Sequence, residues 1–171
     1  MNITKFFLVI FAGLIAIFFG FKPLHVDSKT EKEVPQFEIK NFVLYELDAN
    51  SLQTFMIGSN AKKYKDRYTV KNIDYTDNGK DFIANIKAKN GLYKGDIINL
   101  NNDVKYVRED GLNFTTQHIV YNKKTKVAVA DTNYTLVQNK NIMKGSYLRY
   151  DNFHKTMKSK NIDAIYQIKK D

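Results

Sequence analysis

The feature that most limits the fold is the stretch from residue 36 onward, which contains no proline and in which apolar and polar side chains alternate. A period of two places successive side chains on opposite faces of a β-strand. The clearest examples run over residues 82–88 and 112–120. The chain also holds 11 Tyr and 12 Phe, which favour strands over helices. The pattern therefore predicts an all-β domain over residues 36–171.

Polar turn signals separate these runs at intervals of about 8 to 12 residues, a spacing typical of β-sandwiches and barrels. Three pairs tolerate positive φ and indicate hairpins, namely Asn78-Gly79, Asn90-Gly91 and Asp110-Gly111. Further polar breaks fall at residues 101–103, 122–125, 139–141 and 151–152. We expect stacked hairpins with open ends, in an open β-jelly roll or splayed β-sandwich.

Two of the expected strands carry more specific predictions. In the first, the alternation predicts that Phe37, Ile39, Val43, Tyr45 and Leu47 share one face. In the next, Tyr68 and Val70 are followed by Ile73 and Tyr75 after a slip of one residue, which indicates a bulge.

An unbroken apolar run, FFLVIFAGLIAIFFGF at residues 6–21, precedes this domain. As a helix it reaches roughly 24 Å, slightly short of a bilayer core of about 30 Å, and apolar residues on both sides close most of the gap. No small-residue cleavage site follows the run, and the absence of cysteine excludes lipoprotein cleavage. We therefore expect one uncleaved transmembrane helix within residues 1–24, a charged linker over residues 25–35 and an exported carboxyl-terminal domain.

Charge narrows the classes of partner. Beyond residue 26 the chain carries 25 of its 27 basic residues and all 18 acidic ones, a net charge of +7. For an exported domain, phospholipid headgroups and phosphorylated glycolipids are more plausible anionic partners than nucleic acid. The simpler alternative is a solvated, Lys-rich surface without a specific anionic partner.

The search for catalytic or metal-binding motifs finds none. His25, His118 and His154 lie far apart in sequence, and the chain contains no G-x-S-x-G motif and no Gly-rich phosphate loop. We expect no enzymatic activity, no catalytic residue, no metal site and no cofactor. The segment Asp131-Thr-Asn133-Tyr-Thr135 has the form of a bacterial N-glycosylation sequon, and Asn113-Phe-Thr115 has only the shorter form. Both segments are more often ordinary strand residues.

Anchor, linker and β-domain in this order resemble the LptC family, which are bitopic inner-membrane proteins of lipopolysaccharide export. The domain is also similar to the LptA/OstA fold. The resemblance spans residues 3–168 and is carried by the segments 35–45, 83–93, 100–106, 111–121, 141–145 and 148–150. One departure is Asn101-Asn102-Asp103, which stands where the repeated unit usually has a glycine.

The resemblance implies a β-jelly roll with an apolar groove that shelters acyl chains. It implies a non-enzymatic protein of the inner membrane, with its domain in the periplasm of a Gram-negative cell. Such a protein receives lipopolysaccharide from the LptB-F-G ABC transporter and passes it to a periplasmic LptA-like protein during outer-membrane biogenesis. The alternative is a membrane-anchored adaptor that binds only proteins and whose alternating Phe and Ile side chains are plain core.

Candidate site residues follow from the alternation together with the resemblance. The predicted acyl-chain contacts are residues on apolar faces of central strands: Phe82, Ile86, Ile98, Phe114 and Tyr134. The predicted transporter-docking edge is the first strand, with Phe37, Ile39, Val43 and Tyr45. The predicted edge for the next protein is the last strand, residues 161–168, with Ile162, Ala164 and Tyr166, and Gly145 just upstream.

Overall fold

The computed structural model describes residues 33–48, 51–79 and 82–167. Within these ranges the regular structure is all β, in agreement with the predicted class. The described residues contain no helix that is long and apolar enough to span a membrane. The expected anchor, residues 6–21, lies outside the described residues, as does Ile168.

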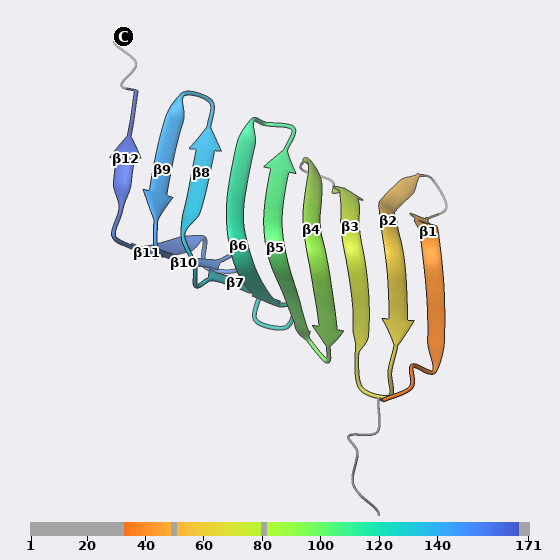
Figure 1. The fold of residues 1–171 in the computed structure, drawn as a ribbon. Coiled ribbons are helices and arrows are strands. Elements are labelled where there is room, and N and C mark those ends of the chain that lie inside the picture. The colour runs from red at the N-terminus through yellow and green to blue at the C-terminus, as the bar shows by residue number, and fades with distance from the viewer. Residues whose placement is uncertain (1–32, 49–50, 80–81, 168–171) are drawn as a thin grey trace, which may run out of the picture. The chain divides into compact units, whose positions relative to one another are not determined.

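Within the described ranges, twelve strands form one antiparallel sheet (Figure 1). Their bounds are β1 Phe37–Leu47, β2 Leu52–Lys63, β3 Tyr68–Asn78, β4 Ile83–Lys94, β5 Ile97–Arg108, β6 Leu112–Asn122, β7 Val127–Ala130, β8 Tyr134–Gln138, β9 Asn141–Gly145, β10 Tyr147–Asp151, β11 Thr156–Lys160 and β12 Asp163–Ile165. The alternation had not indicated β2, whose apolar residues are clustered rather than alternating.

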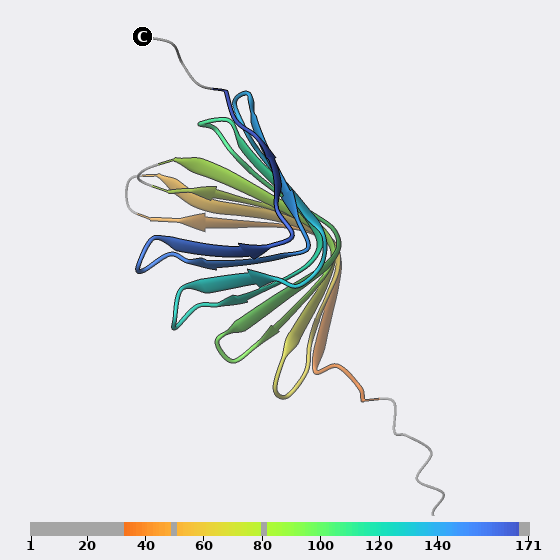
Figure 2. The same cartoon turned by 90° about the vertical axis from the view of Figure 1, so that its left-hand side faces the viewer.

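The sheet forks at β6. One part of β6, Val120–Asn122, pairs with β7, and another, Leu112–Thr116, pairs with β8. From there β7, β10 and β11 form one wing, and β8, β9 and β12 form the other. We call these the β7 wing and the β8 wing. Strands β1 to β6 run through both wings, so that one half of each strand belongs to the β7 wing and the other half to the β8 wing. The folded unit has a V-shaped profile, and hairpin loops line the mouth of the V (Figure 2).

Every strand that crosses both wings bends at one line, which we call the crease. Asn41 in β1, Asn72 in β3 and Asn102 in β5 have φ values of 49°, 52° and 63° there. Asn and Asp tolerate this left-handed conformation better than other side chains that carry a Cβ. Beyond β6 the chain breaks at the crease instead, between β7 and β8, between β9 and β10, and between β11 and β12.

The bend changes which residues share a face. A Cβ on Gly58 would lie 2.6 Å from the Phe42 ring and 3.1 Å from Cγ1 of Val70, so these three positions face the same side. Val70 pairs with Ala61, and Ala61 pairs with Ile39. Phe42 and Ile39 therefore share a face although they are three residues apart.

This geometry confirms one expectation about the strands and corrects another. The slip between Val70 and Ile73 is real and arises from the left-handed Asn72. The prediction that Val43 and Tyr45 share a face with Phe37 and Ile39 is wrong, because the bend at Asn41 moves them to the opposite face.

The turn predictions are mostly confirmed, with two exceptions. Turns occur at Asn78-Gly79, at Asp110-Gly111 and at the breaks near residues 123, 139 and 152. Asn90-Gly91 is not a hairpin but lies inside β4, and the turn follows at Gly95, where φ is +57°. A Cβ on Gly91 would overlap Cδ1 of Ile73, so this glycine serves close packing across the crease. The expected break at residues 101–103 is a bend within β5.

A cluster of buried residues lies where the sheet forks, while Ile73, Ala84, Ala88 and Val104 are buried outside it. The cluster consists of Phe114, Ala130, Tyr134 and Leu148, and the half-buried side chains packed against it are Tyr106, Ile119, Leu136 and Met143. The rings of Phe114 and Tyr134 stack with centroids 5.7 Å apart. Because Ala130 and Leu148 belong to the β7 wing and Phe114 and Tyr134 to the β8 wing, the cluster joins the two wings on their concave side.

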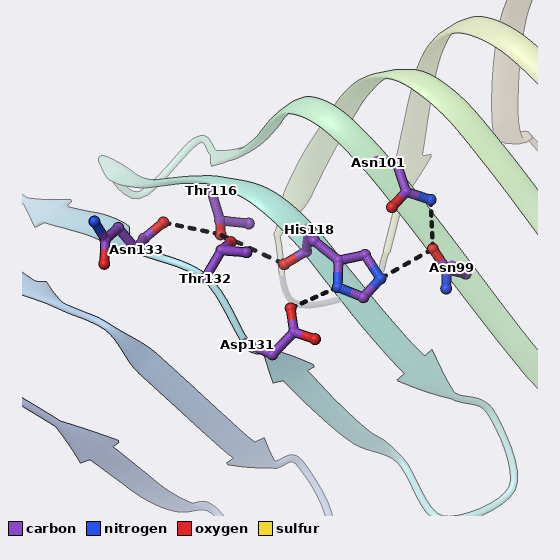
Figure 3. A network of polar contacts seen from close by, with 7 residues as sticks. All are labelled: Asn99, Asn101, Thr116, His118, Asp131, Thr132 and Asn133. Carbon is purple, nitrogen blue, oxygen red and sulfur yellow. Dashed lines mark hydrogen bonds and ion pairs between the residues drawn. The ribbon is translucent and has the colours of Figure 1, made fainter.

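A network of polar contacts connects the strands at the crease, beside this cluster (Figure 3). The Thr116 hydroxyl lies 2.8 Å from the Thr132 hydroxyl and 3.1 Å from the carbonyl oxygen of Asn133. His118 Nδ1 lies 2.5 Å from Asp131 Oδ1, and its Nε2 lies 3.1 Å from Asn99 Oδ1. These contacts tie β5 and β6 to the break between β7 and β8.

Candidate functional site

The concave side of the V, which we call the inner face, carries apolar rows on both wings, while the β8-wing row nearest the mouth includes Glu46, Asp77 and Arg108. In antiparallel sheets, directly opposed residues point to the same face. On the β8 wing the pairing registers connect nine such residues in one row across the sheet: Leu44, Met56, Tyr75, Ile86, Tyr106, Phe114, Leu136, Met143 and Ala164. One row thus spans the whole sheet without a charged side chain.

The β7 wing contributes a second apolar lining to the same face. Its row nearer the crease contains Ile39, Ala61, Val70, Gly91, Leu100 and Ile119. Its row nearer the mouth contains Phe37, Lys63, Tyr68, Tyr93, Ile98 and Tyr121. Lys63 is the one charged residue among these twelve, and it lies at the mouth.

Burial along the inner face changes from one end of the sheet to the other. Phe114 and Tyr134, near the fork, are 5% and 3% exposed. Leu44 and Phe37, on β1, are 56% and 58% exposed. Most of the residues between them are half-buried. The inner face is therefore a closed core near the fork and an open apolar surface toward β1.

The tyrosines of the β8-wing row do not bring charge into this surface. Burial raises the pKa of Tyr75, and the nearby carboxylates of Asp77 and Glu46 raise it further. Burial also raises the pKa of Tyr106. Both phenols therefore stay neutral at physiological pH, and the row is apolar along its length.

The opposite, outer face is polar over the central strands. One of its rows contains Asp74, Lys87, Lys105, Thr115, Thr135 and Lys144. Lys87 Nζ lies 2.7 Å from Asp74 Oδ2. A hollow at the crease is lined on this side by Lys105, Thr115 and Lys144. Toward β1 the outer face becomes apolar, with Val43, Tyr45 and Ile57 exposed.

The predicted acyl-chain residues fall into three groups. Ile86 and Ile98 lie on the inner face, on the β8 and β7 wings respectively. Phe114 and Tyr134 lie on the same face but belong to the closed core. Phe82 precedes β4 at the mouth of the V, where the Arg108 guanidinium lies 4.2 Å from its ring centroid.

The predicted docking residues lie at the two ends of the sheet. Within the described part of the chain, β1 pairs only with β2, and β11 and β12 pair only with β10 and β9. Phe37, Ile39, Val43 and Tyr45 are exposed on β1. Ile162, Ala164 and Tyr166 are exposed in or beside β12.

Gly145 lies at the crease rather than at a free edge. A Cβ there would be 2.7 Å from Tyr134 Cε1 and 2.8 Å from the carbonyl oxygen of Lys160. The close approach of Tyr134 and β11 thus requires a glycine, which assigns Gly145 a packing role within the fold.

The two sequon asparagines occupy different settings. Asn133 is exposed in the break between β7 and β8, while its neighbour Tyr134 is buried. Asn113 lies inside β6 and is half-buried. As for metals, no group of three or more His, Asp or Glu residues that could bind an ion occurs in the described ranges.

Several inner-face residues were not identified from the sequence as site residues. They include Met56 on the unpredicted β2, and Tyr75, Tyr106, Leu136 and Met143. They also include Lys63, Tyr68, Tyr93 and Lys123, which meet at the mouth of the β7 wing. Only the register of the sheet brings these positions together, and alternation within one strand does not reveal it.

Comparisons with known proteins agree with this geometry. Among solved structures, the fold is similar to that of LptH, the LptA-homologous periplasmic component of the lipopolysaccharide transport device of Pseudomonas aeruginosa. The TM-score is 0.52 at 12% sequence identity, and the match covers 77% of this chain and 94% of that one. No curated protein sequence matches. The family model described as lipopolysaccharide-assembly, LptC-related, matches residues 7–167. The chain therefore belongs to the LptC-related family of lipopolysaccharide-assembly proteins.

Proposed function

We propose that this protein transports lipopolysaccharide without catalysing a reaction, and that acyl chains bind on the open part of its inner face. It receives lipopolysaccharide from an inner-membrane ABC transporter of the LptB-F-G type and passes it to an LptA-like periplasmic protein. Membership of the LptC-related family supports the pathway. The likeness to LptH supports a fold shared with a periplasmic component of that device.

The observation that carries the proposal is an apolar lining that the domain itself does not cover. Leu44 is more than half exposed, although its row contains the buried Phe114 near the fork, and Phe37 is more than half exposed on the β7 wing. Exposed apolar surface of this kind marks binding sites on proteins. Each methylene group transferred from water to such a surface contributes about 0.8 kcal/mol. An acyl chain along the inner face would therefore be held strongly without directional contacts.

The free edges support the proposed handover. An edge strand presents unpaired N–H and C=O groups, to which a strand of another protein can add. We assign the β1 edge to the transporter and the edge of the last strand, β12, to the LptA-like protein, with a single-pass anchor in residues 1–24 holding the domain in the periplasm. In this arrangement the ligand would enter the open part of the inner face at its β1 end.

The experiment for ligand binding makes the same substitution, Ile to Arg, on opposite faces of the sheet. Ile86→Arg places a charge in the inner β8-wing row, and Ile57→Arg places the same charge on the outer face. We expect Ile86→Arg to abolish lipopolysaccharide binding by the full-length protein in nanodiscs, and Ile57→Arg to leave it unchanged. Far-ultraviolet circular dichroism verifies the fold of both variants. A folded Ile86→Arg variant that binds normally would refute the ligand claim and leave the protein-only adaptor.

The edge assignment has its own experiment. Deleting residues 161–171 removes β12 and should abolish capture of an LptA-like protein, while membrane insertion and association with the transporter persist. Capture of the partner at wild-type affinity by the truncated protein would place that docking edge at the wrong end.

A further inference from the structure

Two sets of hairpin loops line the mouth of the V (Figure 2), and their sequences differ in charge. On the β7 wing, the loops at residues 64–67, 95–96, 123–126 and 152–155 contain six basic and two acidic residues. On the β8 wing, the described residues of the loops contain one basic residue, Lys140, and three acidic residues, Asp48, Glu109 and Asp110. The net charges are thus +4 and −2, and the mouth has one basic side.

The basic side carries a cluster of four residues that faces the interior. Tyr68 and Tyr93 are directly opposed on the inner face and stack with ring centroids 6.1 Å apart. Lys63 Nζ lies 5.7 Å from the Tyr68 centroid, and Lys123 Nζ lies 5.3 Å from the Tyr93 centroid. We call these four residues the basic rim. The Lys123 backbone N–H donates to the Asp96 carbonyl at 2.8 Å, which holds its loop against the next one.

The two ammonium groups of the basic rim are available to a ligand. Asp66 pairs with Arg67 in its own loop and with Lys94 at the end of β4, and Asp110 pairs with Arg108 on the β8-wing side of the mouth. The ion pairs among residues 33–48, 51–79 and 82–167 include neither Lys63 nor Lys123. Behind the rim, the β7-wing lining continues with Ile98 and Val70.

We propose that the basic rim binds the phosphate groups of an amphiphile whose acyl chains lie on the inner face, so that the headgroup is held at the β7-wing side of the mouth. This inference rests on the proposed function, because it orients the same ligand. Aromatic side chains beside Lys residues are typical of boundaries between apolar and polar phases. Two uncompensated cations above stacked rings, with an apolar lining behind them, match a ligand with a phosphorylated head and hydrocarbon chains.

The test measures binding of two ligands by the full-length protein in nanodiscs: lipid A with its phosphates, and the same lipid A after enzymatic dephosphorylation. The key variant is the double substitution Lys63→Glu and Lys123→Glu. The matched control is Lys140→Glu, which makes the same charge change on the β8-wing side of the mouth. A second double variant, Lys63→Gln with Lys123→Gln, removes the charges while keeping polar side chains only about one bond shorter, in case charge reversal disturbs the fold.

We expect the Glu double variant to bind phosphorylated lipid A about tenfold more weakly than wild type, and the Gln double variant to lose less, because exposed charge pairs are individually weak. Binding of dephosphorylated lipid A should be unchanged in both, and Lys140→Glu should bind both ligands normally. Raising ionic strength should weaken the wild type toward the Gln variant, because salt screens exposed charges. Inorganic phosphate at matched ionic strength should not displace the lipid.

Three results would overturn the inference alone: unchanged binding of phosphorylated lipid A in both double variants, equal loss of both ligands, or displacement by inorganic phosphate. Failure of the wild type to bind either lipid would instead refute the proposed function, and the inference with it.

Discussion

The two ends of the inner face share one residue pattern but differ in what covers it. Near the fork, Phe114 and Tyr134 of the β8 wing meet Ala130 and Leu148 of the β7 wing and become buried. Tyr134 also reaches across the V, with its hydroxyl 2.6 Å from Ser159 Oγ on β11. Toward β1, Leu44 lies in the same row as Phe114 but remains more than half exposed, as does Phe37 on the β7 wing.

This difference separates stability from binding within one lining. Near the fork the two wings cover each other, so apolar side chains there stabilise the fold by leaving water. Toward β1 the same kind of side chain stays in contact with water until something else covers it. The closed end should therefore dominate the free energy of unfolding, and the open end should dominate ligand binding.

The largest expected effect contrasts one large side chain from each end. Phe114→Ala should lower the free energy of unfolding by about 3–5 kcal/mol, because it removes a buried ring and leaves a cavity. Leu44→Ala should cost under about 1 kcal/mol, because its side chain is already largely hydrated. Urea unfolding of the full-length protein, followed by tyrosine fluorescence, measures both. Equal losses would contradict the division into a closed and an open end.

The next effect tests how closely the wings approach at the crease. Gly91→Ala should destabilise the fold by about 1–3 kcal/mol, because the new methyl group overlaps Cδ1 of Ile73. Ile73→Val removes that carbon, so the double variant should recover part of the loss. A double-mutant cycle in urea measures the coupling between the two positions. Strictly additive losses would show that the crease is looser than this contact requires.

A smaller effect concerns acid stability at the closed end. The backbone N–H and imidazole of His154 hold the pKa of Asp151 below its usual range, and the backbone N–H of Phe153 adds to the effect. A carboxyl with a lowered pKa stabilises the fold above its ordinary pKa of about 4, and this contribution is lost as the pH falls through the lowered value. Thermal melting between pH 7 and pH 3 should show this loss. Asp151→Asn should melt lower at pH 7 and lose less on acidification, and an unchanged pH dependence would contradict the assignment.

Alternation and turn chemistry predicted most of the fold because each acts within a few residues. The runs 82–88 and 112–120 lie within or beside β4 and β6, and Asp110-Gly111 is the turn between β5 and β6. The slip after Val70 was visible because both halves of β3 are apolar on one face. In β1 the left-handed Asn41 moved Val43 and Tyr45 to the outer face, and nothing in the alternation marks that change.

The site was harder to predict because it depends on register. Asn90-Gly91 has the composition of a turn, but Gly91 is required by Ile73, which lies on another strand. The basic rim likewise joins residues 63, 68, 93 and 123 through three separate pairings or loop contacts. The spacing of residues along the sequence does not reveal such contacts between different strands.

The most direct test of an acyl-chain surface at the open end uses two adjacent residues on β2. Met56 lies in the inner β8-wing row, and Ile57 points to the outer face. Ile57 is 40% exposed and Met56 is less exposed, so accessibility alone would favour labelling from position 57. A photoreactive phenylalanine is placed at each position in turn, in cells that make lipopolysaccharide. If acyl chains bind on the open part of the inner face, lipopolysaccharide crosslinks from position 56 and not from position 57. Equal labelling at the two positions, or stronger labelling from 57, would contradict this claim.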